Sequence, residues 1–226
     1  MNQEFKTNFH PLFKVAWYLS LIMLILIPIQ ILIFVVSPPP TTVKGLFELY
    51  RQNPFLGLLS LDFLYIINNI ILIVIDLALF VLLYNERPTT ISLALIFAVV
   101  SNACYYPSNP AFEMLTLSNH YFQALPGELN IYLSAGEALM AGYTGTTFDV
   151  YYVLGALSLL LFTYSLLKSP NSKKSLGVWG LISGVLMIIP SSAGLLGMIF
   201  SLLSLIPWLV FIFLLMRKFR ELALSR

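Results

Sequence analysis

Charged residues are scarce in this chain. Lysine, arginine, aspartate and glutamate together make up 10% of the 226 residues, whereas about 25% is usual in soluble globular proteins. Hydrophobic residues make up 59%, and the mean hydropathy is +0.89. So few charges cannot cover the apolar surface of a soluble fold of this length, and the composition excludes disordered, coiled-coil and ordinary soluble proteins. We therefore interpret the chain as a polytopic membrane protein.

The sequence also lacks a disulfide framework and any recognisable catalytic or metal-binding motif. It has one cysteine, Cys104, no Asn-x-Ser/Thr acceptor, and two histidines, neither of them in an HExxH motif. It therefore predicts no disulfide, no metal site, no cofactor and no particular catalytic residue, and it leaves the redox compartment open. A net charge of +2 gives no electrostatic footprint for nucleic acid.

Long apolar runs predict the membrane helices. A bilayer core about 30 Å thick needs about 20 helical residues, and Val15–Val36 supplies 22 before Ser37 and three prolines end the run. Its length, and the absence of a small-x-small cleavage site before Ser37, indicate a retained anchor rather than a signal peptide. Leu176–Met216 has 41 residues, which suits two crossings. We expect six membrane helices at about 15–36, 55–84, 89–106, 147–167, 176–190 and 195–216.

Two regions outside these runs are more polar. Residues 43–51 place apolar side chains at helical spacing opposite charged ones, which predicts a short helix in the membrane interface. Its apolar residues are Val43, Leu46, Phe47 and Tyr50. Polar residues interrupt the outward connection 107–146 every two to four positions, and we expect two helices there that lie at the membrane surface or dip into it. The predicted fold is all-α: a single membrane domain over 1–226, a polytopic bundle of about six transmembrane helices with short interfacial helices.

Basic residues are concentrated on one side of the predicted membrane. Six crossings place both termini on the same side, which would hold ten of the twelve lysines and arginines. These ten are Lys6, Lys14, Arg87, Lys168, Lys173, Lys174, Arg217, Lys218, Arg220 and Arg226. This excess predicts that both termini are cytoplasmic and that the protein lies in the cell membrane. The 80 residues between Arg87 and Lys168 contain acidic residues but no basic one, and this acidic connection is expected to face outward.

Small residues recur on the last two predicted helices. One helix face carries three glycines, and a face of the next helix carries two glycines and two serines. They are Gly177, Gly180 and Gly184, then Gly194, Gly197, Ser201 and Ser204. Such faces let helix backbones approach closely, so their expected role is packing. Ile212, further along the last helix, is expected to face lipid.

Four short segments are similar to a known group of sequences. They are Asn109–Leu115 (NPAFEML), Ala135–Leu139 (AGEAL), Gly145–Phe148 (GTTF) and Tyr152–Gly155 (YVLG). Through them the chain resembles a family of prokaryotic multi-pass membrane proteins that is described as a domain of unknown function. The resemblance covers the middle third well and the final two helices loosely. It implies a prokaryotic membrane protein of about this size, and it implies no activity for any residue.

Polar side chains form a stripe in the second predicted helix. Asp62, Tyr65, Asn69 and Asp76 are separated by steps of 3, 4 and 7 residues, which place them along one face of an α-helix. A carboxylate in hydrocarbon costs roughly 2.5–3.5 kcal/mol, so this face must contact protein or water. The stripe is either a polar seam that joins helices or one wall of a functional cavity.

The expected topology adds a cluster at the outer ends of three helices. Helix two enters from outside, helix three leaves there and helix four re-enters there, with the acidic connection above them. We predict an outward-facing ligand pocket, since a few placed polar groups and aromatic walls are typical of one. The alternative is an interfacial tyrosine belt with solvated loop acids. The predicted ligand-binding residues are Asp62, Tyr65, Asn69, Asn102, Tyr105, Glu137 and Asp149.

Three classes of function remain open at this level. The first is binding or transport of a small cationic or amphipathic molecule through the acidic, aromatic-lined cavity. The second is an intramembrane enzyme that uses paired carboxylates as acid and base. The third is a helper subunit of another membrane protein. Membrane lipid is an expected partner and nucleic acid is not, while the oligomeric state stays open.

Overall fold

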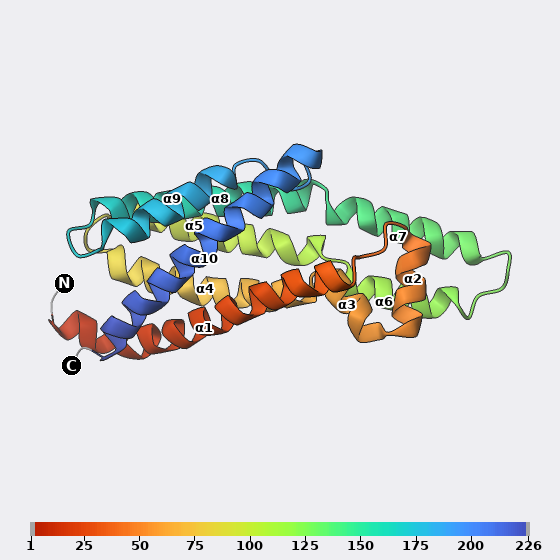
Figure 1. Cartoon of the computed structure of the whole chain (residues 1–226), viewed down its shortest axis with the longest axis horizontal. Helices are drawn as coiled ribbons and strands as arrows, with labels where there is room; N and C mark the ends of the chain where they lie inside the picture. The colour runs from red at the N-terminus through yellow and green to blue at the C-terminus, as the bar shows by residue number, and fades with distance from the viewer. Residues whose placement is uncertain (1–2, 225–226) are drawn as a thin grey trace.

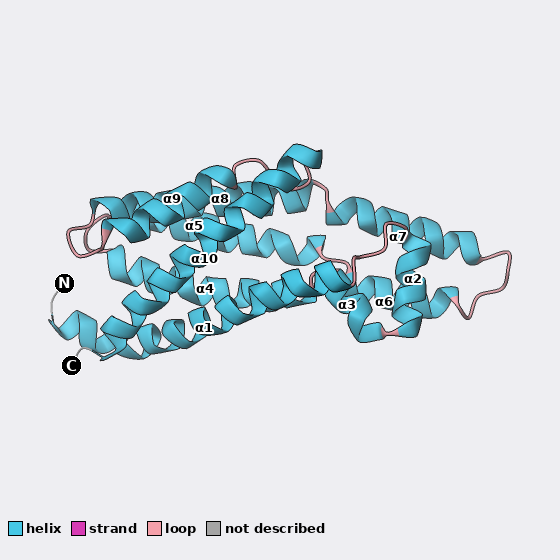
Figure 2. Ribbon diagram, viewed as in Figure 1, coloured by secondary structure: helices cyan, strands magenta, loops and turns pink. Residues whose placement is uncertain are grey.

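The protein is helical throughout the part that is described. The computed structural model describes residues 3–224, and this part contains ten helices and no strand (Figure 2). The helices are α1 (Gln3–Val36), α2 (Val43–Gln52), α3 (Pro54–Ser60), α4 (Phe63–Leu83), α5 (Pro88–Ser108), α6 (Ala111–Tyr121), α7 (Leu129–Tyr143), α8 (Thr146–Lys168), α9 (Lys174–Leu186) and α10 (Gly194–Leu224). Two of the ten basic residues predicted on the cytoplasmic side are not fully described: Arg226 and the side chain of Lys6 lie outside the described part.

Five stretches of the described chain are long and apolar enough to cross a membrane. They are Phe9–Val36, Phe63–Leu83, Pro88–Tyr121, Leu129–Lys168 and Gly194–Leu224. The predicted all-α polytopic fold is therefore confirmed. The stretch predicted at 176–190 corresponds to α9, which has 13 residues and is about 20 Å long at 1.5 Å per residue. It is apolar but shorter than the five others.

A bundle and an extension make up the molecule (Figure 1). Helices α1, α4, α5, α8, α9 and α10 run along the long axis, and both termini lie at the same end of the bundle. At the opposite end, α2, α3, α6 and α7 form the extension. Each part has its own apolar core, the first built around residues such as Phe162 and Phe211 and the second around Phe47 and Met114.

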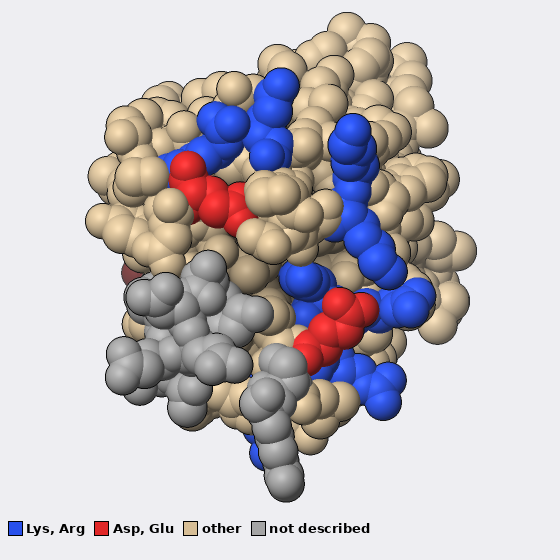
Figure 3. Space-filling view, turned by 90° about the vertical axis from the view of Figure 1, so that its left-hand side faces the viewer, with Lys and Arg blue, Asp and Glu red and all other residues tan. Residues whose placement is uncertain are grey.

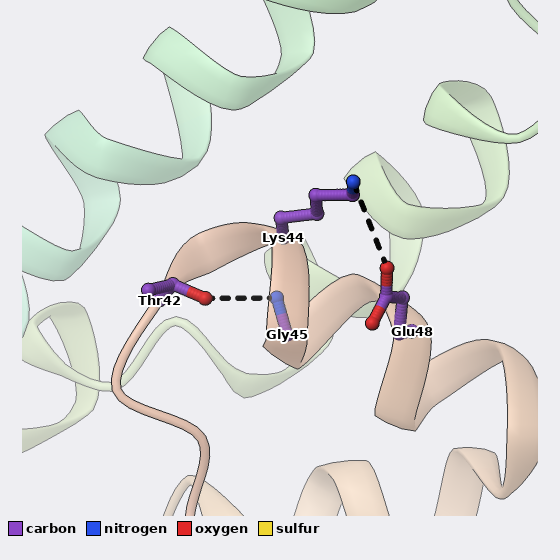
Figure 4. A network of polar contacts seen from close by, with 4 residues as sticks. All are labelled: Thr42, Lys44, Gly45 and Glu48. Carbon is purple, nitrogen blue, oxygen red and sulfur yellow. Dashed lines mark hydrogen bonds and ion pairs between the residues drawn. The ribbon is translucent and has the colours of Figure 1, made fainter.

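Helix α2 forms as its sequence predicts but packs differently. Thr42 accepts a hydrogen bond from the Gly45 N–H at 3.1 Å and so caps the first turn, and Lys44 lies 4.0 Å from Glu48 one turn on (Figure 4). The four apolar residues of the helix are all buried. They contact α6 residues in the core of the extension, so protein rather than lipid covers this face.

The predicted helix 55–84 is interrupted. Helix α3 ends at Ser60 and α4 begins at Phe63, because Asp62 has a left-handed backbone (φ 59°) that no α-helix continues through. The Asn109 side chain donates to the Leu61 carbonyl at 2.8 Å and so satisfies a backbone group that the interruption leaves free. The expectation that Asp62 shares a helix face with Asp76 is therefore wrong: Asp62 lies at the N-cap of α4.

The face of α10 also differs from the sequence expectation. Ile212 is completely buried, in contact with the bundle core, and does not face lipid. Helix α10 continues past the apolar run to Leu224, and its last turns pack Phe219 against Phe13 of α1, with ring centroids 6.1 Å apart. An apolar side chain in a membrane bundle can thus face either a neighbouring helix or lipid, and composition does not distinguish the two.

Candidate functional site

A cavity of about 130 Å³ lies inside the bundle, between α1, α4, α5, α8 and α10. Its walls are mostly apolar and aromatic, with polar groups on four of these helices. Helix α4 contributes Tyr65, Asn68, Asn69, Leu72, Ile75, Asp76 and Leu79; α5 contributes Ala98, Ser101 and Asn102; α8 contributes Tyr151, Tyr152, Gly155, Ser158, Leu159 and Phe162; α10 contributes Ser201, Ser204, Leu205, Trp208, Phe211 and Ile212; Met23, Ile27 and Met187 complete the lining.

Three amide side chains in this lining have unsatisfied atoms. Asn68, Asn69 and Asn102 are 4%, 2% and 2% exposed. Both polar atoms of Asn68, the Asn69 Nδ2 and the Asn102 Oδ1 lack a hydrogen-bond partner in the described chain. A buried polar group without a partner costs about 1–3 kcal/mol, so nearly all such groups in native proteins are satisfied by protein or by ordered water. The lining therefore holds four buried polar atoms whose hydrogen bonds the described protein does not supply.

Asp76 supplies the acidic group of the cavity. It lies seven residues after Asn69, about two turns along the same face of α4, and it is 8% exposed. No hydrogen bond or ion pair joins it to another described residue. Among the described residues that line the cavity there is no lysine, arginine or histidine. The lining therefore contains one carboxyl and no basic group opposite it.

Two serine hydroxyls of the lining donate to the backbone of the facing helix and hold α5 against α8. Ser101 of α5 donates to the Tyr151 carbonyl at 2.6 Å, and Ser158 of α8 donates to the Ala94 carbonyl at 2.7 Å. Gly155 lies between them, where a Cβ atom would be 3.1 Å from the Ser101 Oγ. Two hydrogen bonds and a close approach thus fix α5 against α8, so this wall is preformed.

A series of side-chain contacts, three hydrogen bonds and one ring contact, connects the interruption before α4 with the cavity. The Tyr143 hydroxyl donates to the Asp62 carboxylate, and the Tyr105 hydroxyl lies 3.4 Å from the Asp62 carbonyl. The Tyr105 and Tyr151 rings are 4.9 Å apart, and the Tyr151 hydroxyl reaches the Asn69 Oδ1 at 3.4 Å. Burial raises the pKa of Asp62 to about 6, against the opposing effect of the Tyr143 hydrogen bond.

The structure brings together only some of the predicted ligand-binding residues. Tyr65, Asn69 and Asn102 line the cavity. Asp62 and Tyr105 belong to the series of contacts just described, but they lie at its end near α4's first residue, outside the cavity lining.

Glu137 and Asp149 lie elsewhere. Glu137 is exposed on α7, because the extension carries that helix away from the bundle. Asp149 accepts a hydrogen bond from Ser192 in the loop before α10. Neither residue lines the cavity, so the predicted cluster of outer acids does not form around it.

Sequence reasoning missed several residues of the lining. Asn68 is adjacent to Asn69 in an otherwise apolar run, and this amide pair was a visible signal. Tyr151 and Trp208 carried no such signal, because aromatic residues are common in lipid-facing and interfacial positions as well. Asp76 was recognised as part of a polar stripe, but only the tertiary structure shows that it shares a cavity with Asn102.

The helices and the cavity define a multi-pass α-helical membrane protein whose bundle contains a mostly apolar cavity with a few polar groups in its walls. The chain belongs to the family described as Domain of unknown function (DUF4386), whose sequence model matches residues 15–218. The resemblance seen in the four short segments is therefore confirmed, and the match includes most of every helix of the bundle. Neither the curated proteins nor the solved structures give a match to this chain.

Proposed function

We propose that this protein binds a small organic cation, or the cationic head of an amphipathic molecule, in the bundle cavity. The observation that supports this most directly is Asp76, a carboxyl buried among membrane helices with no basic residue opposite it in the lining. An ionised carboxylate at such a depth is costly unless it is paired. A bound cation would provide the missing partner.

The rest of the lining suits such a ligand. The free Asn102 Oδ1 and Asn68 Oδ1 can accept N–H bonds from an ammonium group. Trp208, Phe162 and Phe211 offer aromatic surface for the apolar part and for cation–π contact. The volume of about 130 Å³ restricts the enclosed group to a small one.

Catalysis is less well supported than binding. The intramembrane enzyme considered above needs two carboxylates as acid and base, whereas the cavity lining contains Asp76 as its one carboxyl. Transport is a further step beyond binding and needs its own measurement. We also propose, from the distribution of basic residues, that the protein lies in the cell membrane with both termini in the cytoplasm.

A charge series at nearly constant shape tests the binding proposal. The probes are phenethylammonium, the neutral phenethyl alcohol and the anionic 3-phenylpropionate, added to the full chain in neutral detergent. Trp17 and Trp179 are replaced by phenylalanine so that Trp208, in the cavity wall, reports binding by its fluorescence. We expect the cation to bind at least about tenfold more tightly than the neutral probe, since a charge-assisted hydrogen bond contributes about 1.5–3 kcal/mol.

Two matched variants test whether the preference for the cation depends on Asp76. Asp76→Asn should remove the preference for the cation, while Glu137→Gln, which removes one negative charge from the exposed face of α7, should retain it. Thermal unfolding of both variants checks that they are folded. Equal binding of all three probes, or an unchanged preference in folded Asp76→Asn, would refute the proposal.

A further inference from the structure

A second pocket, of about 260 Å³, is separate from the cavity and shares no lining residue with it. It is formed by the loop between α8 and α9, the first turn of α9 and the last part of α10. Lysine and arginine side chains gather on this end of the molecule (Figure 3). The proposed binding of a cation in the bundle does not involve this pocket.

Three basic residues line the pocket: Lys173, Arg217 and Lys218. Glu221 is the one acidic residue in the lining, and no ion pair joins it to these three within the described chain. Lys218 donates to the Asn171 carbonyl at 3.1 Å and so holds the loop against α10. The lining therefore has a net positive charge, and Lys173 and Arg217 form no ion pair or hydrogen bond with another described side chain.

Uncharged donors face the same space. Ser172 lines the pocket, and its Oγ is buried with no hydrogen-bond partner in the described chain. Helix α9 begins directly after Lys173, and no side chain caps its N-terminus. The free N–H groups of a helix N-terminus and its dipole both favour an anion. A buried hydroxyl, three cations and an uncapped helix start thus converge on one pocket.

The remaining surroundings are apolar. Leu176 and Leu214 line the inner side of the pocket. Further along the same two helices, Trp179 of α9 and Phe213 of α10 are exposed, as expected for side chains that contact lipid tails. The pocket therefore lies at the boundary between charged and apolar surface, where the phosphate of a membrane lipid resides.

We propose that this pocket binds the phosphate group of an anionic phospholipid. Lys173 and Arg217 pair with the phosphate oxygens, the Ser172 hydroxyl and the start of α9 donate hydrogen bonds to them, and the acyl chains lie along the exposed faces of α9 and α10. A soluble phosphate has the same headgroup chemistry, but it would leave this adjoining apolar surface unused.

Native mass spectrometry of the full chain in neutral detergent tests this assignment. The probes are phosphatidylglycerol, phosphatidylcholine and inorganic phosphate. We expect phosphatidylglycerol to bind most tightly, and Lys173→Gln/Arg217→Gln to weaken it roughly 30-fold, because each basic residue near an anionic lipid contributes about one factor of five. The matched control is Lys168→Gln/Lys174→Gln, which removes two charges next to the same loop from residues outside the lining.

A specific loss in the first double variant, with little change in the control, supports the site. Equal losses in both variants would mean diffuse attraction to a basic surface, and would overturn it. Inorganic phosphate that binds as tightly as phosphatidylglycerol and responds equally to Lys173→Gln/Arg217→Gln would assign the pocket to a soluble anion and overturn the lipid assignment. Ser172→Ala, which removes the hydroxyl and no charge, should weaken lipid binding severalfold.

Discussion

Of the three glycines in α9, Gly180 makes the tightest contact with neighbouring helices. A Cβ atom at this position would be 2.3 Å from the Thr163 Cγ2 of α8 and 2.9 Å from the Phe211 Cδ2 of α10. Thr163 is fully buried, and its Oγ1 donates to the Leu159 and Leu160 carbonyls at 2.8 and 3.1 Å. Its methyl group therefore cannot rotate away without breaking these hydrogen bonds. We predict that Gly180→Ala destabilises the bundle.

The expected magnitude is a difference between two effects. Replacing a helical glycine with alanine lowers the cost of ordering the backbone by about 0.5–1 kcal/mol. Forcing an extra methyl group into a packed site costs about 1–3 kcal/mol. The second effect exceeds the first here, because both close neighbours are buried ring or methyl atoms on other helices. Gly180→Ala should therefore lower the free energy of unfolding by about 1–2 kcal/mol.

Unfolding of the purified chain in mixed micelles with increasing sodium dodecyl sulfate measures this difference. Gly142→Ala is the matched control, since Gly142 lies in α7 and a Cβ atom there meets nothing within 4 Å. That variant should be neutral or slightly stabilised.

A second replacement tests the cause. Thr163→Ser keeps the hydroxyl but removes the methyl group that Gly180→Ala would strike. In the Thr163→Ser background, Gly180→Ala should be less destabilising by about 1 kcal/mol. If the loss is the same in both backgrounds, the contact with Thr163 is not its cause and the reasoning fails.

Two further predictions concern the orientation of the chain in the membrane and the pH dependence of its stability. In a Cys104→Ser background in intact cells, Leu125→Cys at the tip of the extension should react with an impermeant maleimide and Asn171→Cys should not; labelling of position 171 from outside would contradict the proposed orientation. Because burial raises the pKa of Asp62 to about 6, the folded state holds its proton more tightly than the unfolded state, where the pKa is about 3.9. Protonated Asp62 therefore stabilises the folded state fully below about pH 4. This contribution to the free energy of unfolding, at most about 3 kcal/mol, is lost as the pH rises through about 6. Unfolding of Asp62→Asn should lack this pH dependence, and an identical pH profile in wild type and variant would show that Asp62 is not its source.

Local information in the sequence was sufficient to locate most of the long helices and several of their ends. The length of each apolar run is a one-dimensional property that can be compared with the thickness of a bilayer, and prolines and charged clusters mark where runs end. In this way the stretches 147–167 and 195–216 were placed close to α8 and α10. The apolar spacing of Val43, Leu46 and Phe47 likewise predicted α2 and its buried face.

The candidate site could be predicted only in part. The stripe on the second predicted helix contained Tyr65, Asn69 and Asp76 of the cavity, since helical spacing alone relates them. Asn102 was added from the expected topology. Glu137 and Asp149 lie near the same predicted helix ends in sequence. The direction of α7 carries Glu137 away from the cavity, and Asp149, in the first turn of α8, is bonded to Ser192 instead.

The sequence by itself therefore determined that this is a polytopic helical membrane protein and where its long helices lie. Only the tertiary structure decided which helix faces meet. The interruption at Asp62 is stabilised by the Asn109 side chain, which donates a hydrogen bond to the Leu61 carbonyl. Because these two residues are 48 positions apart, no local sequence pattern predicts the interruption. Ile212 faces the protein core and Phe213 next to it is exposed, although both are apolar. Because lipid and the bundle interior are about equally apolar, hydrophobicity fixes that a helix lies in the membrane but not the direction in which its side chains point.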